Sequence, residues 1–323
     1  MDVSHRVEHH RYTVLLAEMM FYFAKTGHEY GVIHGITTES CWLSQILRNL
    51  PSFVSSNTVF HLGAIYVENQ RQHQDRFVPE QCKFRVHTAP RRFALELPVH
   101  HGLKVYENEE FAIIDKPSGW PMHATVDNAQ ENLLANLTQT SLTEGFSQKY
   151  YLTHRLDVPT RGLVFFAKSP TSQKNFNKLL QTHEVSKSYL ALTEKIIPVG
   201  KHTHYMKPSP KAPKELQLTP EDPTWLRCEL IVEDSVAIPA SDYALTRIQL
   251  ITGRTHQIRA QLSFLGGAIG GDEPYGARPM RGANSIALAC VAMQFPWQNE
   301  DWTFSLSPKS VLADWTQLFK TKI

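Results

Sequence analysis

The chain of 323 residues is long enough for one large domain or for two of ordinary size. Its hydrophobic fraction of 42% and aromatic fraction of 10% are typical of a packed globular protein and exclude an intrinsically disordered one. The net charge of +2 does not indicate a polyanionic partner for the chain as a whole. Residues 149–187, however, hold seven Lys or Arg against two acids, and residues 201–214 hold four lysines and no acid. Such stretches can neutralise phosphates, although an ordinary solvated surface explains them equally well.

Cysteines and histidines do not form a metal-binding pattern. The four cysteines are widely scattered without a CxxC pair, and the sixteen histidines include no HExxH motif. We therefore predict no metal site and a reducing compartment, the cytoplasm.

The apolar run at residues 13–24 is interrupted by Glu18 and is too short to span a membrane, so we expect a packed helix there. Basic residues ahead of this run leave a cleaved import sequence open.

The first hundred residues predict a small N-terminal α/β accessory region. Apolar residues at 40–50 have helical spacing, and alternation at 59–67 and 83–88 is typical of short strands. Residues 90–98 would form the exit linker. We therefore predict one domain at residues 1–98 and a second at residues 99–323.

The rest of the chain predicts apolar strands with helices interspersed irregularly, which favours an α+β fold over strict βαβ alternation. The predicted strands are residues 111–115, 162–167, 188–193, 226–232 and 243–251. The predicted helices are residues 128–142, 169–183 and 256–264. Ser169 and Pro170 suit the N-cap and first position of the second helix, and Gly266-Gly267 suits the end of the third.

Asp157 is the first candidate for chemistry. It ends the segment His154-Arg155-Leu156-Asp157, directly before a predicted turn and a buried strand. A carboxylate on a loop that enters a buried strand is rigidly placed yet accessible, as a nucleophile or general base requires. A turn residue paired with Arg155 explains the tetrapeptide equally well.

Three further segments carry weaker signals. Residues 250–259 run from a strand into a helix, and neither Arg254 nor Arg259 is offset by a nearby acid. Each arginine must therefore find a carboxylate or a phosphate elsewhere. Residues 266–276 contain five glycines, which suits close backbone approach. Tyr189 brings an aromatic hydroxyl on a strand, where such a residue is more often part of the core.

Taken together, these motifs resemble those of the RluA-like pseudouridine synthases over about residues 100–306. They occur in the family's order: Asp115-Lys116-Pro117-Ser118-Gly119 with His123, HRLD at 154–157, Lys-Ser-Tyr at 187–189, TGRTHQIR at 252–259, then Gly-Asp and Tyr-Gly. The resemblance implies a mixed, mainly antiparallel central sheet flanked by helices. It also implies isomerisation of uridine to pseudouridine in structured ribosomal or transfer RNA by a monomer. Because an isomerisation needs neither redox change nor external donor, no cofactor is expected.

The resemblance assigns roles to individual residues. Asp157 would be the nucleophile that lets uracil detach through N1 and reattach through C5. Tyr189 would stack against the base and accept a proton, and Arg259 would pair with Asp157. Arg155 would fill the gap left by the flipped-out uridine. The other candidates are His154, Arg161, Arg254 and His256 for contacts to RNA, and Ile258 and Lys116 for the pocket.

The chain departs from the family pattern in places. Arg161 stands where the family usually has Ser, which adds a phosphate contact or shifts the loop, and Ala289 stands where a His is frequent. Residues 63–69 resemble the hairpin of the alpha-L RNA-binding domain. Because the preceding helix has Arg48 as its sole basic residue, we predict a degenerate version of that domain.

Two alternatives remain. A non-catalytic RNA-binding protein on the same fold would use Asp157 for structure alone. A carboxylate-based glycosidase or base-releasing enzyme would need a second acid paired with Asp157, and we expect none there.

Overall fold

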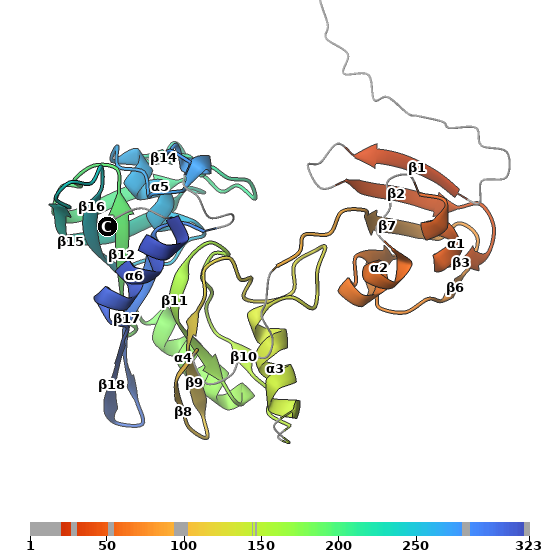
Figure 1. The fold of residues 1–323 in the computed structure, drawn as a ribbon, viewed down its shortest axis with the longest axis horizontal. Coiled ribbons are helices and arrows are strands. Elements are labelled where there is room, and N and C mark those ends of the chain that lie inside the picture. The colour runs from red at the N-terminus through yellow and green to blue at the C-terminus, as the bar shows by residue number, and fades with distance from the viewer. Residues whose placement is uncertain are drawn as a thin grey trace, which may run out of the picture. The chain divides into compact units, whose positions relative to one another are not determined.

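The computed structural model describes residues 21–26, 31–50, 55–93, 103–143, 145, 147–279 and 285–319. Contacts divide the chain into two units (Figure 1). The first contains Met1–Leu95 and His123–Ala135, and the second contains Glu96–Met122 and Asn136–Ile323. The predicted boundary after residue 98 lies close to this division, but the return of residues 123–135 to the first unit was not predicted.

The first unit is a five-stranded antiparallel sheet with two short helices. Its elements are β1 (Phe21–Thr26), β2 (Val32–Thr37), β3 (Cys41–Trp42), α1 (Leu43–Arg48), α2 (Ser56–Leu62), β4 (Ile65–Val67), β5 (Gln70–Gln72), β6 (Phe77–Val78) and β7 (Lys83–His87). The sheet has the order β1-β2-β7-β4-β5, and β3 pairs separately with β6. Buried side chains of β4 and β7, including Ile65 and Val86, share one core with Leu47 of α1 and Val59 of α2.

Two predictions for this unit are wrong. Residues 21–24, predicted as helix, lie in β1, which pairs along its length with β2, while residues 13–20 lie outside the described residues. Residues 59–62, predicted as strand, belong to α2, which Ser55 caps and which ends at Gly63 with φ +62°. Both are short apolar runs, for which periodicity does not separate helix from strand.

The predicted hairpin in this unit is confirmed. Strands β4 and β5 are antiparallel, and Glu68 and Asn69 join them with φ values of +48° and +63°. Positive φ at both positions is the geometry of a tight two-residue hairpin turn. A relationship to the alpha-L domain stays a prediction.

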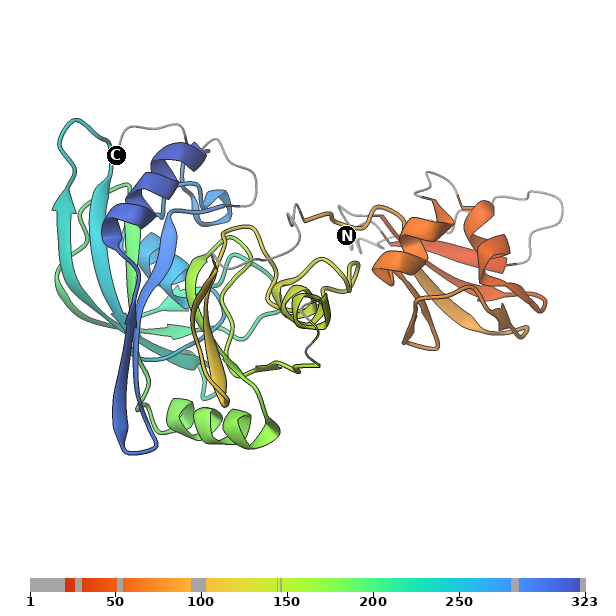
Figure 2. The same cartoon turned by 60° about the horizontal axis from the view of Figure 1, so that its bottom comes forward.

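The second unit contains an 11-stranded sheet with helices. Its elements are β8 (Lys104–Glu107), β9 (Phe111–Lys116), α3 (Leu133–Thr143), β10 (Tyr151–Leu152), β11 (Arg161–Ala167), α4 (Pro170–Gln181), β12 (Ser186–Thr193), β13 (Gly200–Met206), β14 (Leu216–Gln217), β15 (Leu226–Ala237), β16 (Ala244–Leu250), α5 (Gln257–Phe264), the 3-10 helix η1 (Glu273–Tyr275), β17 (Leu288–Trp297), β18 (Glu300–Ser305) and α6 (Pro308–Phe319). Figure 2 shows the strongly twisted sheet and the long hairpin of β17 and β18.

The strand order of this sheet is β14-β13-β15-β16-β12-β17-β11-β9-β8, with β10 on β11 and β18 on β17. Among the described strands, β11 and β17 are the parallel pair, and all other pairs are antiparallel. The predicted α+β class with a mixed, mainly antiparallel sheet is therefore confirmed.

Aromatic side chains form the core around β9, β11 and β17. The Phe111 and Phe165 rings lie with centroids 4.9 Å apart, and Phe176 of α4 stacks on Phe165 at 3.7 Å. Helix α4 begins at the predicted N-cap, since the Ser169 side chain accepts a hydrogen bond from the Ser172 N–H and Pro170 follows the cap. This core fixes β11, and the loop ahead of β11 carries Asp157.

Gly162 fixes how β11 approaches β17. Its φ is +126°, and it lies opposite Cys290 in the parallel pair. A Cβ atom at this position would stand 2.2 Å from the Cys290 carbonyl oxygen. Both the backbone conformation and the space therefore require glycine.

We expect Gly162→Ala to lower the free energy of unfolding by about 3 kcal/mol, because it combines a strained φ with a backbone clash. Urea denaturation measures this loss. Gly253→Ala is the matched control, since no atom stands within 4 Å of its added Cβ, and its stability should change by less than about 0.5 kcal/mol. Equal stability of Gly162→Ala and the wild type would contradict this account.

Candidate active site

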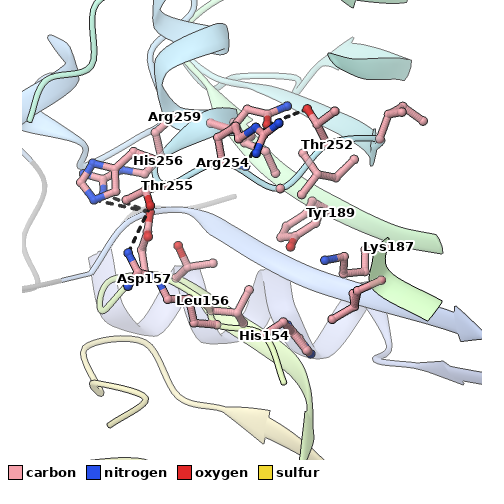
Figure 3. Close-up of a pocket in the computed structure, with 18 of the residues that line it drawn as sticks. His154, Leu156, Asp157, Lys187, Tyr189, Thr252, Arg254, Thr255, His256 and Arg259 are labelled. Atoms are coloured by element: carbon pink, nitrogen blue, oxygen red, sulfur yellow. Dashed lines mark hydrogen bonds and ion pairs between the residues drawn. The ribbon is translucent and has the colours of Figure 1, made fainter. Parts of the chain in front are cut away.

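A pocket of about 430 Å³ opens in the second unit where the loop ahead of β11 meets strand β12 and the start of α5 (Figure 3). Eight of the ten predicted site residues line it: His154, Arg155, Asp157, Tyr189, Arg254, His256, Ile258 and Arg259. These residues come from segments about a hundred positions apart in the sequence. The fold therefore brings together the two motifs, HRLD and TGRTHQIR, that the sequence singled out.

Asp157 presents its carboxylate to this pocket. Its side chain is 17% exposed, and Oδ2 lies 3.3 Å from Nη1 of Arg259. The same oxygen lies 3.8 Å from Nε2 of His256. The carboxylate is thus held by a guanidinium on one side while part of it stays accessible from the pocket.

The loop after Asp157 is fixed by hydrogen bonds to the turn at residues 116–119. The carbonyl of Val158 accepts from the Gly119 N–H at 2.8 Å and from Lys116 Nζ at 3.1 Å. The Ser118 hydroxyl donates to the Pro159 carbonyl at 2.5 Å. The turn therefore positions the loop that carries the carboxylate.

Lys116 does not line the pocket, which corrects the prediction. Its side chain is fully buried below the loop, and Nζ also donates to the carbonyls of Pro117 at 2.9 Å and Trp120 at 2.8 Å. Burial lowers the pKa of Lys116 to about 7, although the charges of Asp157 and Asp115 oppose this shift. With three carbonyl acceptors, this amine positions the loop and has no free donor for a substrate.

Arg259 is held by Asp272 in a buried, bidentate pair. Its Nε and Nη2 donate to the two carboxylate oxygens at 2.7 and 2.8 Å, and Asp272 is fully buried. The ring of Tyr275 lies under the guanidinium, 4.9 Å from its carbon. Burial disfavours the charged form, but the hydrogen bonds and charges of Asp272 and then Asp157 outweigh it and raise the pKa of Arg259. Nη1 of this permanent cation is left to face Asp157.

Asp272 is a second acid close to Asp157, which the sequence pattern did not predict. Both of its oxygens accept hydrogen bonds from Arg259, and its side chain has no exposed surface. A glycosidase needs a second carboxyl group that can exchange a proton with substrate or water. Asp272 cannot do this in the observed arrangement, so the glycosidase alternative gains no support.

His256 connects Asp157 to Tyr275. It has φ +60° at the N-cap of α5, and its Nδ1 lies 3.0 Å from the Tyr275 hydroxyl. That hydroxyl accepts the Lys214 backbone N–H at 3.0 Å, so its own proton is free to point to Nδ1. Burial lowers the pKa of His256, with Asp157 opposing and Arg259 adding to the shift, which favours the neutral ring. The ring proton then lies on Nε2, which faces Asp157.

Tyr189 forms a buried wall of the pocket. It is 4% exposed and pairs with Ile248 in the ladder of β12 and β16. Burial, followed by the Cys290 thiol, raises the pKa of Tyr189 well above 10, so the hydroxyl stays protonated. This position suits packing against a flat base. The predicted role of Tyr189 as a proton acceptor stays a prediction.

Of the other predicted residues, His154 holds the loop of Asp157 in place, whereas Arg155 and Arg254 lie at the exposed rim of the pocket. His154 Nε2 accepts the Phe165 N–H at 3.0 Å, and burial lowers the pKa of His154 well below 6.5, so it is a neutral loop anchor. Arg155 is exposed and donates to the Thr255 hydroxyl at 3.2 Å. Arg254 is exposed at the rim. Both rim arginines suit contacts with phosphates.

Arg161 lies outside the pocket, which argues against its predicted contact with RNA. Its Nη2 pairs with Asp115 at 2.8 Å and its Nη1 with Asp314 of α6 at 3.3 Å. Burial raises the pKa of Asp314, and Arg161 partly offsets this. Arg161 is the register partner of Ala289 in β17, so the two departures from the family pattern are neighbours.

Sequence reasoning missed Gln257, which orders the rim loop. Its Oε1 accepts from the Thr252 hydroxyl at 2.8 Å and the Arg254 N–H at 3.0 Å, while its Nε2 donates to the Glu229 carbonyl at 3.0 Å. Asp272 and Tyr275 lie in the Gly-Asp and Tyr-Gly motifs, from which no role for either side chain could be predicted. The available signal was the two uncompensated arginines, which required a carboxylate partner somewhere in the fold.

The described part of the chain contains no group of three or more His, Cys, Asp or Glu side chains arranged to hold a metal ion. None of its helices is long and apolar enough to cross a membrane.

We expect Arg161→Ala to lower the free energy of unfolding by about 3 kcal/mol, because Asp115 and Asp314 would lose their shared cation. Thermal or urea denaturation measures the change. Arg278→Ala is the matched control, since this exposed arginine also pairs with two acids and should matter little. Unchanged stability with weakened RNA binding would instead support the original prediction of a phosphate contact.

Comparisons with known proteins agree with the geometry. The family model described as RNA pseudouridylate synthase matches residues 110–264. RNA pseudouridine synthase 6, chloroplastic, of Arabidopsis thaliana is 30% identical over 225 residues, which cover 63% of this chain and 46% of that protein. Ribosomal large subunit pseudouridine synthase D of Pseudomonas aeruginosa is 29% identical over 191 residues, which cover 54% of this chain and 53% of that protein.

The match to these curated relatives spans about half of their length. Among solved structures, human RNA Pseudouridylate Synthase Domain Containing 4 superposes with a TM-score of 0.53 and 19% identity, covering 67% of this chain and 92% of that chain. This similarity shows a shared fold. The family model and the sequence relatives show that residues 110–264 belong to the RNA pseudouridylate synthase family.

Proposed function

We propose that this chain isomerises specific uridines in structured RNA to pseudouridine, with Asp157 as the nucleophile. The observation that carries the proposal is the Asp157 carboxylate, which faces a pocket of about 430 Å³ and is held at 3.3 Å by the buried Arg259. A nucleophilic carboxylate must be ionised and fixed in direction, and a neighbouring permanent cation supports both.

The chemistry needs no oxidant, reductant or external group. A carboxylate oxygen of Asp157 bonds to C1′ of the ribose while the bond from N1 to C1′ breaks and its electron pair stays on the base. The base turns, C5 bonds to C1′, and the carboxylate leaves. N1 gains a proton and C5 loses one, so the product is an isomer of the substrate. For this reason we expect no cofactor.

The rim of the pocket suits a flipped nucleotide. The reacting atoms are inaccessible inside a stacked helix, so the uridine must leave the stack at a cost of a few kcal/mol. Arg155 and Arg254 are exposed where the RNA strand would pass, and both line the pocket. We propose that Arg155 occupies the vacated space, where a guanidinium plane stacks on bases, and that Arg254 binds phosphate.

Two classes of RNA are candidates for the substrate. Relatives carry names for both ribosomal and transfer RNA synthases. We propose one of these two as substrate, a monomeric enzyme, and action in the cytoplasm or in an organelle, since two relatives are named chloroplastic. No observation favours an inactive RNA-binding protein on this fold.

We expect the purified chain to convert uridine to pseudouridine in unmodified ribosomal or transfer RNA transcripts without added metal. Tritium release from RNA labelled at C5 of uridine measures loss of the C5 proton, and mass spectrometry of digested RNA identifies the product. Mapping pseudouridine in RNA from cells with and without the gene gives the site. Free uracil in the product would show a base-releasing enzyme instead, and no tritium release from either RNA class would contradict the proposal.

A further inference from the structure

Lys187 extends into the pocket from the same strand face as Tyr189. In the ladder of β12 and β16, Lys187 pairs with Leu250 and Tyr189 with Ile248, so the two side chains lie two positions apart on one face. Both line the pocket. Figure 3 shows the Lys187 ammonium directed toward Tyr189, with Asp157 on the other side of the tyrosine.

The Lys187 ammonium has no hydrogen-bond or ion-pair partner within the described parts of the chain. Two other lysines with little exposed surface have hydrogen-bond or ion-pair partners. Lys116 donates to three carbonyls, and Lys168, 13% exposed, binds the Glu107 carboxylate at 3.2 Å and the Asn108 carbonyl at 2.7 Å. A half-buried cation without an acceptor has lost part of its hydration, which costs free energy. Such a group is expected where a ligand supplies the acceptor.

Among the residues that the structure describes, no group around Lys187 carries a compensating negative charge. Its strand partners are Leu250 of β16 and Met293 of β17. Burial raises the pKa of the Cys290 thiol to about 12 and lowers the pKa of His154 well below 6.5, so both neighbours are neutral. Tyr189 is neutral for the reason given above, and Asp157 is paired with Arg259. The described residues therefore supply no acceptor for this ammonium, and a ligand in the pocket can do so.

A base supplies this acceptor better than a phosphate does. The exposed arginines of the rim already suit phosphates, whereas Lys187 lies beside the buried ring of Tyr189, where the base would pack. In uracil, C4 lies opposite N1 across the ring. When C1′ faces Asp157, the O4 oxygen therefore points to the far side of the pocket, where Lys187 lies.

We propose that the Lys187 ammonium donates a hydrogen bond to a carbonyl oxygen of the target uracil and stabilises the negative charge of the detached base. This inference rests on the proposed isomerisation. When the bond from N1 to C1′ breaks, the electron pair spreads from N1 over O2 and O4, and a fixed cation at O4 stabilises that charge. No proton moves in this step.

The symmetry of uracil lets one lysine serve both halves of the reaction. Rotation of the detached base about the axis through N3 and C6 exchanges N1 with C5 and O4 with O2. After this turn C5 faces C1′, and O2 occupies the place that O4 left. Lys187 therefore contacts O4 before the rotation and O2 after it. Cytosine has an amino group at C4 and cannot accept the first hydrogen bond, so Lys187 also selects uracil.

The test compares Lys187→Met, Lys187→Arg and the control Lys174→Met, a lysine on the exposed side of α4. The rate constant is that of tritium release from C5-labelled RNA under single-turnover conditions. We expect Lys187→Met to lower it about 100-fold, as for loss of one preorganised donor to a developing anion. RNA affinity and thermal stability should not fall, because the lost group was a half-buried charge without a partner among the described residues. Lys187→Arg should recover a large part of the rate, and Lys174→Met should match the wild type.

The pH dependence gives a second readout that a structural role would not produce. Burial lowers the pKa of Lys187 below its usual 10.5. The cation is the active form, so the wild-type rate should fall as pH rises through this lowered pKa. Lys187→Arg stays charged and should keep its rate over the same range.

Three results would overturn the inference. A wild-type rate for Lys187→Met would show that the ammonium does not act. Equal losses in Lys187→Met and Lys187→Arg together with lower melting temperatures would show a structural role. Absence of tritium release from the wild type would instead refute the proposed function and remove the basis of this inference.

Discussion

Arg259 is held by Asp272 through two hydrogen bonds of 2.7 and 2.8 Å, in surroundings that leave Asp272 no exposed surface. This pair determines where Asp157 can act. Two of the guanidinium nitrogens, Nε and Nη2, donate hydrogen bonds to Asp272, which fixes the plane of the group. The third nitrogen, Nη1, therefore faces Asp157 at 3.3 Å. Arginine is suited to this task since its planar fork holds several partners at fixed angles and never loses its charge. A lysine could neutralise Asp157 but could not be oriented in this way.

The fold prepares both sides of that contact. On one side, the aromatic core fixes β11, Gly162 lets it approach β17 closely, and the turn after β9 holds the loop of Asp157 through Lys116 and Ser118. On the other side, Gln257 and His256 order the start of α5, which carries Arg259. As a consequence, the positive charge of Lys187 lies apart from the ion pair of Asp157 and Arg259 in the same pocket. Arg259 pairs with Asp157, whereas Lys187, beside Tyr189, has no partner among the residues that the structure describes.

The sequence was informative where a motif or a strong period was present. It indicated the α+β class, the strand at Phe111, the helix with its Ser169 cap, and eight residues that line one pocket. It failed for Lys116 and Arg161, because motif membership does not say which way a side chain points. Lys116 turns below the loop to three carbonyls, and Arg161 finds Asp115 and Asp314, the latter from a helix 153 residues away in sequence. Partners so far apart in the sequence are set by tertiary packing, and the local sequence pattern carries no information about that packing.

The most direct test of the central claim is the rate of pseudouridine formation by Asp157→Asn. Asparagine keeps the size of the side chain and can still accept a hydrogen bond from Arg259, but it is not an anionic nucleophile. The measurement is pseudouridine in digested RNA after incubation with equal amounts of folded wild-type and variant protein, together with the affinity of each for that RNA. The account predicts no product from the variant and RNA affinity close to that of the wild type. Product formation at the wild-type rate would contradict it.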